Sequence, residues 1–236
     1  NSGDSTTFNI TIPHTNERCV NVYYHVDAVH DFMKSKLPLF TTMDNALPSN
    51  VDVTGTCNAF YNESSINFYA AGGGCNAFSY IGDVMSHEYG HGISDKFYNS
   101  QGGSFDNGAM GEGYSDTWAN SILKTGIIGL GANSVTDFIR RYDIVHKVYP
   151  QDIQGEVHAD GEIIAGAWWD VSVNWGSVDS MSDLFADSYY GLANGPDGAE
   201  GQVYFDILID ALTYDDDNGN IYDGTPHFAY IVDAFA

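Results

Sequence analysis

Three residues in one short segment have the types and spacing needed to hold a metal ion. His87, Glu88 and His91 form the pattern H-E-x-x-H within residues 81–93. On a helix, residues four apart lie on one face, so both imidazoles can bind one ion while Glu88 sits beside them. Catalytic zinc typically has three protein ligands and a water, and a neighbouring carboxylate can take a proton from that water. The pattern predicts a catalytic zinc site that still needs a third ligand.

Glu112 is the candidate third ligand. It follows His91 by 21 residues (112 − 91), which leaves room for the first helix to end and a second helix to return to the metal. The alternative pattern, with a third histidine six residues after His91, is excluded because Ser94 and Phe97 occupy its glycine and histidine positions. Asp116 lies one helical turn beyond Glu112, so it could accept the free N–H of a ligand histidine.

These motifs resemble those of a known family. The segments HEYGHGIS (87–94) and GAMGEGYSD (108–116) resemble the thermolysin-like metallopeptidases, and they look most like the fungalysin-type branch. The resemblance implies a two-lobed α+β metallopeptidase, with the H-E-x-x-H helix between its lobes. It also implies zinc as the cofactor and a peptide or protein as the substrate.

The same resemblance implies roles for residues around the zinc site. The segment 57–61 is similar to the family's edge strand, so Asn58 and Ala59 would hydrogen-bond the substrate backbone. The segment 156–164 is similar to one that carries a second active-site histidine, so His158 would stabilise the oxyanion. The family often supports this histidine with an aspartate five positions earlier. Here residue 153 is isoleucine, and Asp152 or Glu156 would have to replace it.

Two further roles come from the family. Arg140 fits slightly better than Arg141 as the arginine that binds the substrate carbonyl on the leaving-group side. A tyrosine that assists the oxyanion is also expected, and Tyr98 and Tyr142 are its candidates. The simpler alternative for the arginines is pairing with surface carboxylates.

The predicted activity is that of a zinc-dependent endopeptidase. Zinc on His87, His91 and Glu112 would polarise a water, and Glu88 would take its proton as the water attacks the peptide carbonyl. One alternative is a zinc exopeptidase of narrow specificity. Another is a metal-stabilised binding module that has lost catalysis, although such a module would have no reason to retain Glu88.

An acidic segment at 215–223 predicts a second metal site. Asp215, Asp217 and Asp223 flank an Asn-Gly turn and could supply oxygen ligands to calcium, which accepts flexible acidic sites. The segment is not a complete EF-hand loop, because positions 214 and 225 are tyrosine and threonine. The alternative is an acidic turn that is simply solvated.

Composition limits the partners and the compartment. The formal net charge of −24, from 32 acidic residues and 8 Lys+Arg, argues against a nucleic-acid partner. No apolar run is long enough to span a membrane. Among three cysteines, we expect Cys57 and Cys75 to pair, which indicates an oxidising environment. We therefore expect a secreted, extracellular monomer, cut from a precursor with a removable pro-segment.

The order of predicted elements indicates two lobes in one catalytic domain. Residues 1–98 form a mixed lobe, with a strand at 8–12 and a helix from 21, and this lobe includes the H-E-x-x-H helix. Residues 99–236 form a mainly helical lobe, in which Ser134 is expected to open a helix through residue 141. Gly90 and Gly92 inside the metal helix predict close approach of another segment.

Overall fold

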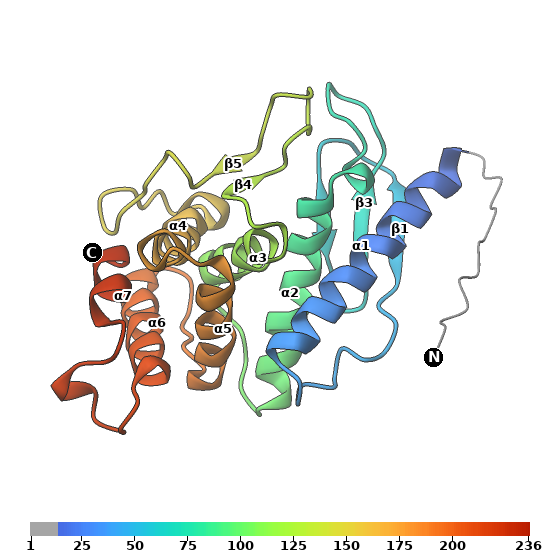
Figure 1. Cartoon of the computed structure of the whole chain (residues 1–236). Coiled ribbons are helices and arrows are strands. Elements are labelled where there is room, and N and C mark those ends of the chain that lie inside the picture. Colours follow the sequence, from blue (N-terminus) through green and yellow to red (C-terminus); the bar gives the residue numbers. More distant parts are fainter. Residues whose placement is uncertain (1–13) are drawn as a thin grey trace.

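The computed structural model describes residues 14–236, with side chains from residue 17, and has an α+β architecture (Figure 1). The helices are α1 His14–Lys36, α2 Gly82–Ser100, α3 Gly108–Leu123, α4 Val157–Trp175, α5 Val178–Ser188, α6 Glu200–Asp215 and α7 Phe228–Ala234. The strands are β1 Ser49–Val53, β2 Ala59–Tyr61, β3 Ile66–Tyr69, β4 Ile127–Ile128 and β5 Arg140–Arg141. The strand expected at 8–12 lies outside the described residues. The predicted α+β class is confirmed, with a mixed first part of the chain and a mainly helical later part.

A small sheet forms one side of the first half of the chain. Its strand order is β1-β3-β2, with β3 parallel to β1 and antiparallel to β2. The strand β2 therefore lies at an edge of the sheet, where one side of its backbone has no strand partner. Helix α1 packs against α2 and β1 (Figure 1). Helix α2 also contacts β2. The edge strand thus lies beside the helix that carries H-E-x-x-H.

Helix α2 lies between α1 and α3 in the centre of the molecule (Figure 1). Gly90 permits the close packing of α2 on α3, because a Cβ atom there would lie 2.9 Å from the Cα atom of Ser115. A Cβ atom at Gly92 would be 3.3 Å from the Tyr61 ring on β2. The predicted close approach at both glycines is confirmed. The boundary predicted after residue 98 falls in the last turn of α2 and stays a prediction.

The helix expected from Ser134 to residue 141 is wrong, because this segment belongs to a β-hairpin. The strands β4 and β5 pair in antiparallel register, and the Ile139 N–H donates to the Ile128 carbonyl oxygen at 2.8 Å. Gly129 and Gly131 adopt φ values of 73° and 93°, which favour a turn and are unfavourable in a helix. Ser134 begins a turn instead, in which its carbonyl accepts the N–H of residue 137.

A buried carboxylate attaches this hairpin to α2. Asp83, in the first turn of α2, accepts hydrogen bonds from the backbone N–H groups of Val84, Gly129 and Leu130. Burial raises the pKa of Asp83 to about 6, against the opposing effect of these N–H groups. The hairpin is therefore held at the start of the helix that carries the metal-binding motif.

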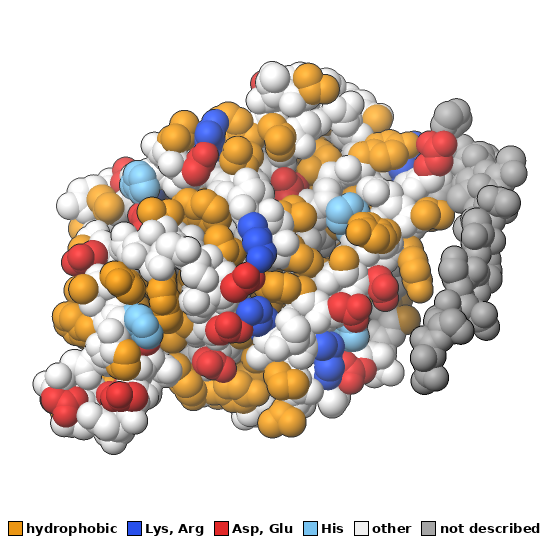
Figure 2. Space-filling view, viewed as in Figure 1, with side chains coloured by type: hydrophobic (Ala, Val, Ile, Leu, Met, Phe, Trp, Pro, Cys, Tyr) orange, Lys and Arg blue, Asp and Glu red, His pale blue; other side chains and the backbone are white. Residues whose placement is uncertain are grey.

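The main hydrophobic core lies among α2, α3, α4, α5 and α6. Its largest fully buried side chains include Trp118, Trp168, Phe185 and Tyr189. No helix within residues 14–236 has both the length and the apolar character needed to cross a membrane. On the face shown in Figure 2, acidic side chains are spread over several elements and basic ones are few. This face therefore has no basic footprint of the kind that binds phosphate.

Candidate active site

Helix α2 presents the two histidines of the H-E-x-x-H pattern on one face. One helical turn separates His87 from His91, and their Nε2 atoms lie 3.1 Å apart. The side chain of His87 is 8% exposed and that of His91 is 21% exposed. The two nitrogens therefore meet in a largely buried place that is still open on the side of His91.

Helix α3 brings Glu112 to the same point. Its Oε2 atom lies 3.3 Å from His87 Nε2, and its Oε1 atom lies 3.4 Å from His91 Nε2. The potential ligand atoms of these three residues all lie within 4.8 Å of one another. Within residues 14–236 this is the one group of three or more such side chains that could hold a metal ion. The structure thus brings all three predicted zinc ligands together.

The chemistry of these donors fits a zinc ion. Glu112 Oε2 is buried and makes no hydrogen bond, so it is a free acceptor aimed at the two imidazoles. Burial by itself lowers the pKa of His87, but Asp116 and Glu112 outweigh this effect and raise the pKa to about 10. The carboxylates therefore attract positive charge to this point. Two imidazoles and one carboxylate form a ligand set found in catalytic zinc sites.

Asp116 supports the site from behind. Its side chain is 2% exposed, and its Oδ1 atom lies 2.6 Å from His87 Nδ1. Arg140 donates to both of its oxygens, from Nε at 2.6 Å and from Nη2 at 2.9 Å, and the Tyr142 hydroxyl donates to Oδ2. Burial raises the pKa of Asp116, but Arg140 and His87 outweigh it and hold the pKa well below its usual range. Because this carboxylate is charged and accepts hydrogen bonds only, His87 Nδ1 carries a hydrogen, and Nε2 is the nitrogen that a metal would bind.

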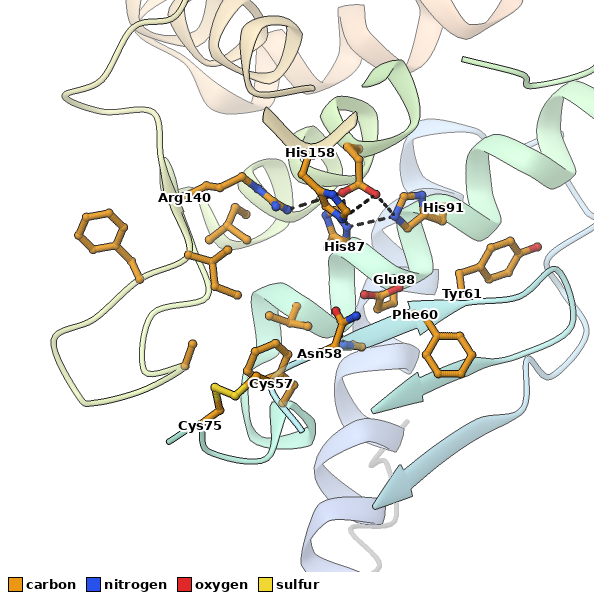
Figure 3. A pocket seen from close by; sticks show the side chains of 18 of the residues that line it. Cys57, Asn58, Phe60, Tyr61, Cys75, His87, Glu88, His91, Arg140 and His158 are labelled. Carbon is orange, nitrogen blue, oxygen red and sulfur yellow. Dashed lines mark hydrogen bonds and ion pairs between the residues drawn. A yellow bond between two sulfur atoms is a disulfide. The ribbon is translucent and has the colours of Figure 1, made fainter. Parts of the chain in front are cut away.

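Glu88 lies next to the ligands and lines the cleft, although it is only 5% exposed (Figure 3). Burial raises the pKa of its carboxyl, against the opposing effect of His87 and His91. Glu88 is not a member of the metal group. It is therefore a carboxylate that is free to exchange a proton with a molecule in the cleft.

The cleft in front of these residues has a volume of about 810 Å³. Residues 57–61, which include Asn58, Ala59 and the whole of β2, form one wall (Figure 3). The disulfide between Cys57 and Cys75, which confirms the predicted pairing, lies at the start of this wall. The third cysteine, Cys19, is free and exposed. The predicted substrate-binding segment therefore presents a sheet edge to the cleft, next to Glu88.

The β-hairpin forms the opposite wall. Phe138, Ile139 and Ile128 line the cleft. Arg140, on the same hairpin, points toward the metal group (Figure 3). The guanidinium group of Arg140 is held by Asp116, and its Nη2 atom lies 3.9 Å from Glu112 Oε2. Sequence reasoning placed Arg140 near a substrate but missed its pairing with Asp116, which links the metal group to this wall.

His158 is the second residue of α4 and points into the cleft beside the metal group (Figure 3). Its Nε2 atom lies 3.5 Å from Glu112 Oε1, and its Nδ1 atom lies 2.7 Å from Glu156 Oε1. The hydrogen bond with His158 lowers the pKa of Glu156. Of the two acidic residues considered for its support, Glu156 is therefore the one that contacts it, because Asp152 instead accepts the backbone N–H of Val148 at 2.8 Å.

The structure contradicts both candidates for an oxyanion tyrosine. The Tyr98 hydroxyl is buried and donates to the Ala193 carbonyl oxygen at 2.9 Å. The Tyr142 hydroxyl is buried and bound to Asp116. Tyr61 is the one tyrosine among the described residues that line the cleft, and its hydroxyl donates to Asp95 at 2.7 Å. Side-chain burial, which decides this point, has no local sequence signal.

Two carboxylates of the predicted calcium segment have protein partners of their own. Asp215 accepts hydrogen bonds from the Thr225 hydroxyl at 2.6 Å and from His227 N and Nδ1, each at 2.7 Å. Asp223 Oδ2 instead accepts a hydrogen bond from the side-chain Nδ2 of Asn218 at 3.3 Å. In the described part of the chain, Asp215, Asp217 and Asp223 do not come together as a metal group. Asp215 thus anchors the start of α7, and calcium binding by this segment stays a prediction.

Comparisons with known proteins agree with this geometry. The family model described as "Thermolysin metallopeptidase, catalytic domain" matches residues 2–95, which include His87, Glu88 and His91. The predicted resemblance to the thermolysin-like metallopeptidases is confirmed over this part of the chain. The fungalysin-type branch stays a prediction.

Among solved structures, the chain is similar to one titled "Precursor of Protealysin, Metalloproteinase from Serratia proteamaculans". The TM-score is 0.65 at 14% sequence identity, over 98% of this chain and 80% of that chain. At this identity the similarity shows the fold, which is thermolysin-like. No curated protein sequence matches the chain.

Proposed function

We propose that this chain is a zinc-dependent endopeptidase with Glu88 as its general base. The observation that carries the proposal is the position of Glu88. This buried carboxylate is not a member of the metal group, and it lines the cleft next to that group. When bound to His87, His91 and Glu112, zinc would supply Lewis-acid chemistry by polarising a carbonyl and acidifying water. The thermolysin family match and the donor set support zinc as the metal.

The remaining steps belong to this chain's own residues. The edge of β2, from Asn58 and Ala59, would hold an extended peptide as an added strand. Glu88 would accept a proton from the attacking water and deliver it to the departing amine. In its protonated form, His158 would donate a hydrogen bond from Nε2 to the oxyanion that develops on the scissile carbonyl, while Nδ1 donates to Glu156.

Several features of the same proposal concern the whole protein. The Cys57–Cys75 disulfide supports secretion into an oxidising compartment. The similar solved structure is titled as a precursor, which supports synthesis with a removable pro-segment. We also propose that the enzyme acts as a monomer and that neither nucleic acid nor membrane is a partner.

Cleavage of unfolded casein tests the activity. The purified protein should make internal cuts that a zinc chelator abolishes and that added zinc restores, as shown by mass mapping of the products. Cuts confined to the chain ends would favour the exopeptidase, and zinc binding without any cleavage would favour the binding module.

Replacement of Glu88 tests the mechanism. Glu88→Gln should keep one equivalent of zinc and lose activity by roughly 10²- to 10⁴-fold, which is typical for loss of a general base. Glu162→Gln is the matched control, because Glu162 pairs with Lys147 at 2.9 Å and does not line the cleft. A Glu88→Gln enzyme that keeps more than about a tenth of the activity would exclude Glu88 as the base.

A further inference from the structure

We propose that a pocket beside the metal group selects substrates with a lysine or arginine close to the scissile bond, an inference that rests on the proposed function. This side pocket has a volume of about 280 Å³. It shares Tyr61, His91 and Glu112 with the cleft, so a peptide bound in the cleft reaches it directly. The volume is below the range typical of sites for whole small molecules and suits one long side chain.

The side pocket lies at the end of the cleft away from the β-hairpin. Arg140 on the hairpin and Tyr61 at the end of β2 lie on opposite sides of the metal-group histidines (Figure 3). A peptide added to the edge of β2 would pass the metal group and continue over Tyr61. Because an extended peptide rises about 3.3 Å per residue, the side chain that enters the side pocket belongs to a residue within about three positions of the scissile bond.

One part of the side pocket is apolar and firmly packed. Phe105 lines it and packs edge-on against the Tyr98 ring, with 4.7 Å between the ring centroids, and Val157 also lines it. Gly111 leaves space in the side pocket, because a Cβ atom there would lie 3.3 Å from the Phe105 ring and 3.9 Å from His91 Nδ1. These surfaces would contact the methylene groups of a long side chain.

The polar part of the side pocket is acidic. Glu63, Asp95 and Asp106 all line it, but Asp95 already pairs with Lys96 at 3.1 Å. In the described part of the chain, neither Glu63 nor Asp106 forms an ion pair with a lysine or arginine. Two carboxylates are therefore left for a positive charge that the substrate brings.

Asp106 is held in place by neutral groups. Its Oδ2 atom accepts hydrogen bonds from the Ser104 hydroxyl at 2.5 Å and from the Asn194 side-chain amide at 3.0 Å. The Asn194 carbonyl oxygen in turn accepts the backbone N–H of Asp106 at 2.9 Å. These contacts fix the position of the carboxylate and add no positive charge, so its attraction for a cation is retained.

The two parts of the side pocket together match a lysine or arginine side chain. Such a side chain has an apolar stem and a charged end, which fit the surface of Phe105 and Val157 and the carboxylates of Glu63 and Asp106. An acidic side chain would be repelled by the same carboxylates. An apolar side chain would fill the space without pairing with them.

A series of matched peptides tests the preference. Each peptide has the same single cleavage site, identified by mass mapping, with lysine, methionine or glutamate at one of the three positions on either side of it. At one of these positions, kcat/KM should be about five- to tenfold higher for lysine than for methionine, which has a similar length and no charge. Glutamate at that position should give the lowest kcat/KM.

A variant of the side pocket links the preference to its carboxylates. The double variant Glu63→Gln, Asp106→Asn should lower the ratio of kcat/KM for the lysine and methionine peptides to about 1, since both charges are removed. Both peptides are cut by the same preparation, so the ratio does not depend on the fraction of folded enzyme. The double variant Asp27→Asn, Asp31→Asn is the matched control, because it removes two exposed charges from α1 that do not line the cleft or the side pocket. This control should keep the ratio.

The possible failures can be told apart. Equal kcat/KM for lysine and methionine at every position, or a ratio that the side-pocket variant keeps, would overturn the inference while the peptidase function stands. A ratio lost equally in the α1 control would show attraction by the net charge of the protein and would also overturn it. A wild-type protein that binds zinc and cleaves no peptide would overturn the proposed function itself.

Discussion

Asp116→Asn should strongly destabilise the fold, because the substitution leaves a buried cation without its hydrogen-bonded carboxylate. Arg140 donates two hydrogen bonds to Asp116, and their side chains are 10% and 2% exposed. Removal of one member of a buried ion pair typically costs about 3–5 kcal/mol, since the remaining charge stays buried. Asparagine keeps the size of the side chain, so the expected loss comes from charge and hydrogen bonding and not from a cavity.

The adjacent arginine provides a matched control. Arg141 donates two hydrogen bonds to Asp143, from Nε at 2.6 Å and from Nη2 at 2.7 Å. The geometry is nearly the same, but this pair lies at the surface, where ion pairs contribute little. Asp143→Asn should therefore produce no measurable change in stability.

Urea unfolding in the presence of a chelator measures the two effects without any contribution from bound metal. For Asp116→Asn the midpoint should fall by about 1–2 M, which corresponds to 3–5 kcal/mol at typical urea slopes. Equal midpoints for Asp116→Asn and Asp143→Asn would refute the reasoning, because burial would then make no difference. Zinc affinity, from competition with a chromophoric chelator, should fall about 10- to 100-fold in Asp116→Asn only.

Two other predictions concern stability. Because burial raises the pKa of Asp83 to about 6 from an ordinary 3.8, its contribution to folding is present at low pH and is lost as the pH rises between these values. The unfolding free energy of Asp83→Asn, measured relative to wild type, should thus increase by up to about 3 kcal/mol between pH 3 and pH 7. A difference that does not change with pH would contradict the raised pKa of Asp83. Gly90→Ala should destabilise by about 1–3 kcal/mol, because its Cβ atom would meet the Ser115 backbone at 2.9 Å. In Gly166→Ala the new Cβ atom meets only the Tyr142 ring at 3.9 Å, so this control should stabilise by about 0.5–1 kcal/mol, and similar midpoints for both variants would contradict the packing argument.

The relation between two of the predicted zinc ligands, His87 and His91, was predictable because it is local. Residues four apart on a helix share a face whatever surrounds them, so the H-E-x-x-H pattern specified the relation between His87 and His91. The same spacing of four residues placed Asp116 one helical turn beyond Glu112 on a second helix. The sequence also allowed three cysteine pairings, from which the short loop between Cys57 and Cys75 favoured the one observed.

The features that sequence reasoning missed all depend on contacts between different segments of the chain. Residues 134–141 have a plausible helix start, but pairing with β4 and the turn at Gly129 and Gly131 override that local preference. Tyr142 looks available in the sequence, yet its hydroxyl is committed to Asp116. The carboxylates of 215–223 resemble a calcium loop in composition, but Asp215 is satisfied by His227.

The sequence by itself therefore determined the chemistry of the site. It supplies two imidazoles one helical turn apart, a carboxylate as the third candidate ligand and a glutamate that is not a ligand. Only the tertiary structure decided how that chemistry is supported. Two sets of contacts depend on how α3, α4 and the hairpin pack. Asp116 binds Arg140 and Tyr142, and Glu156 binds His158. The physical reason is that helical periodicity acts over a few residues, whereas burial and hydrogen-bond partners are settled by the packing of the whole chain.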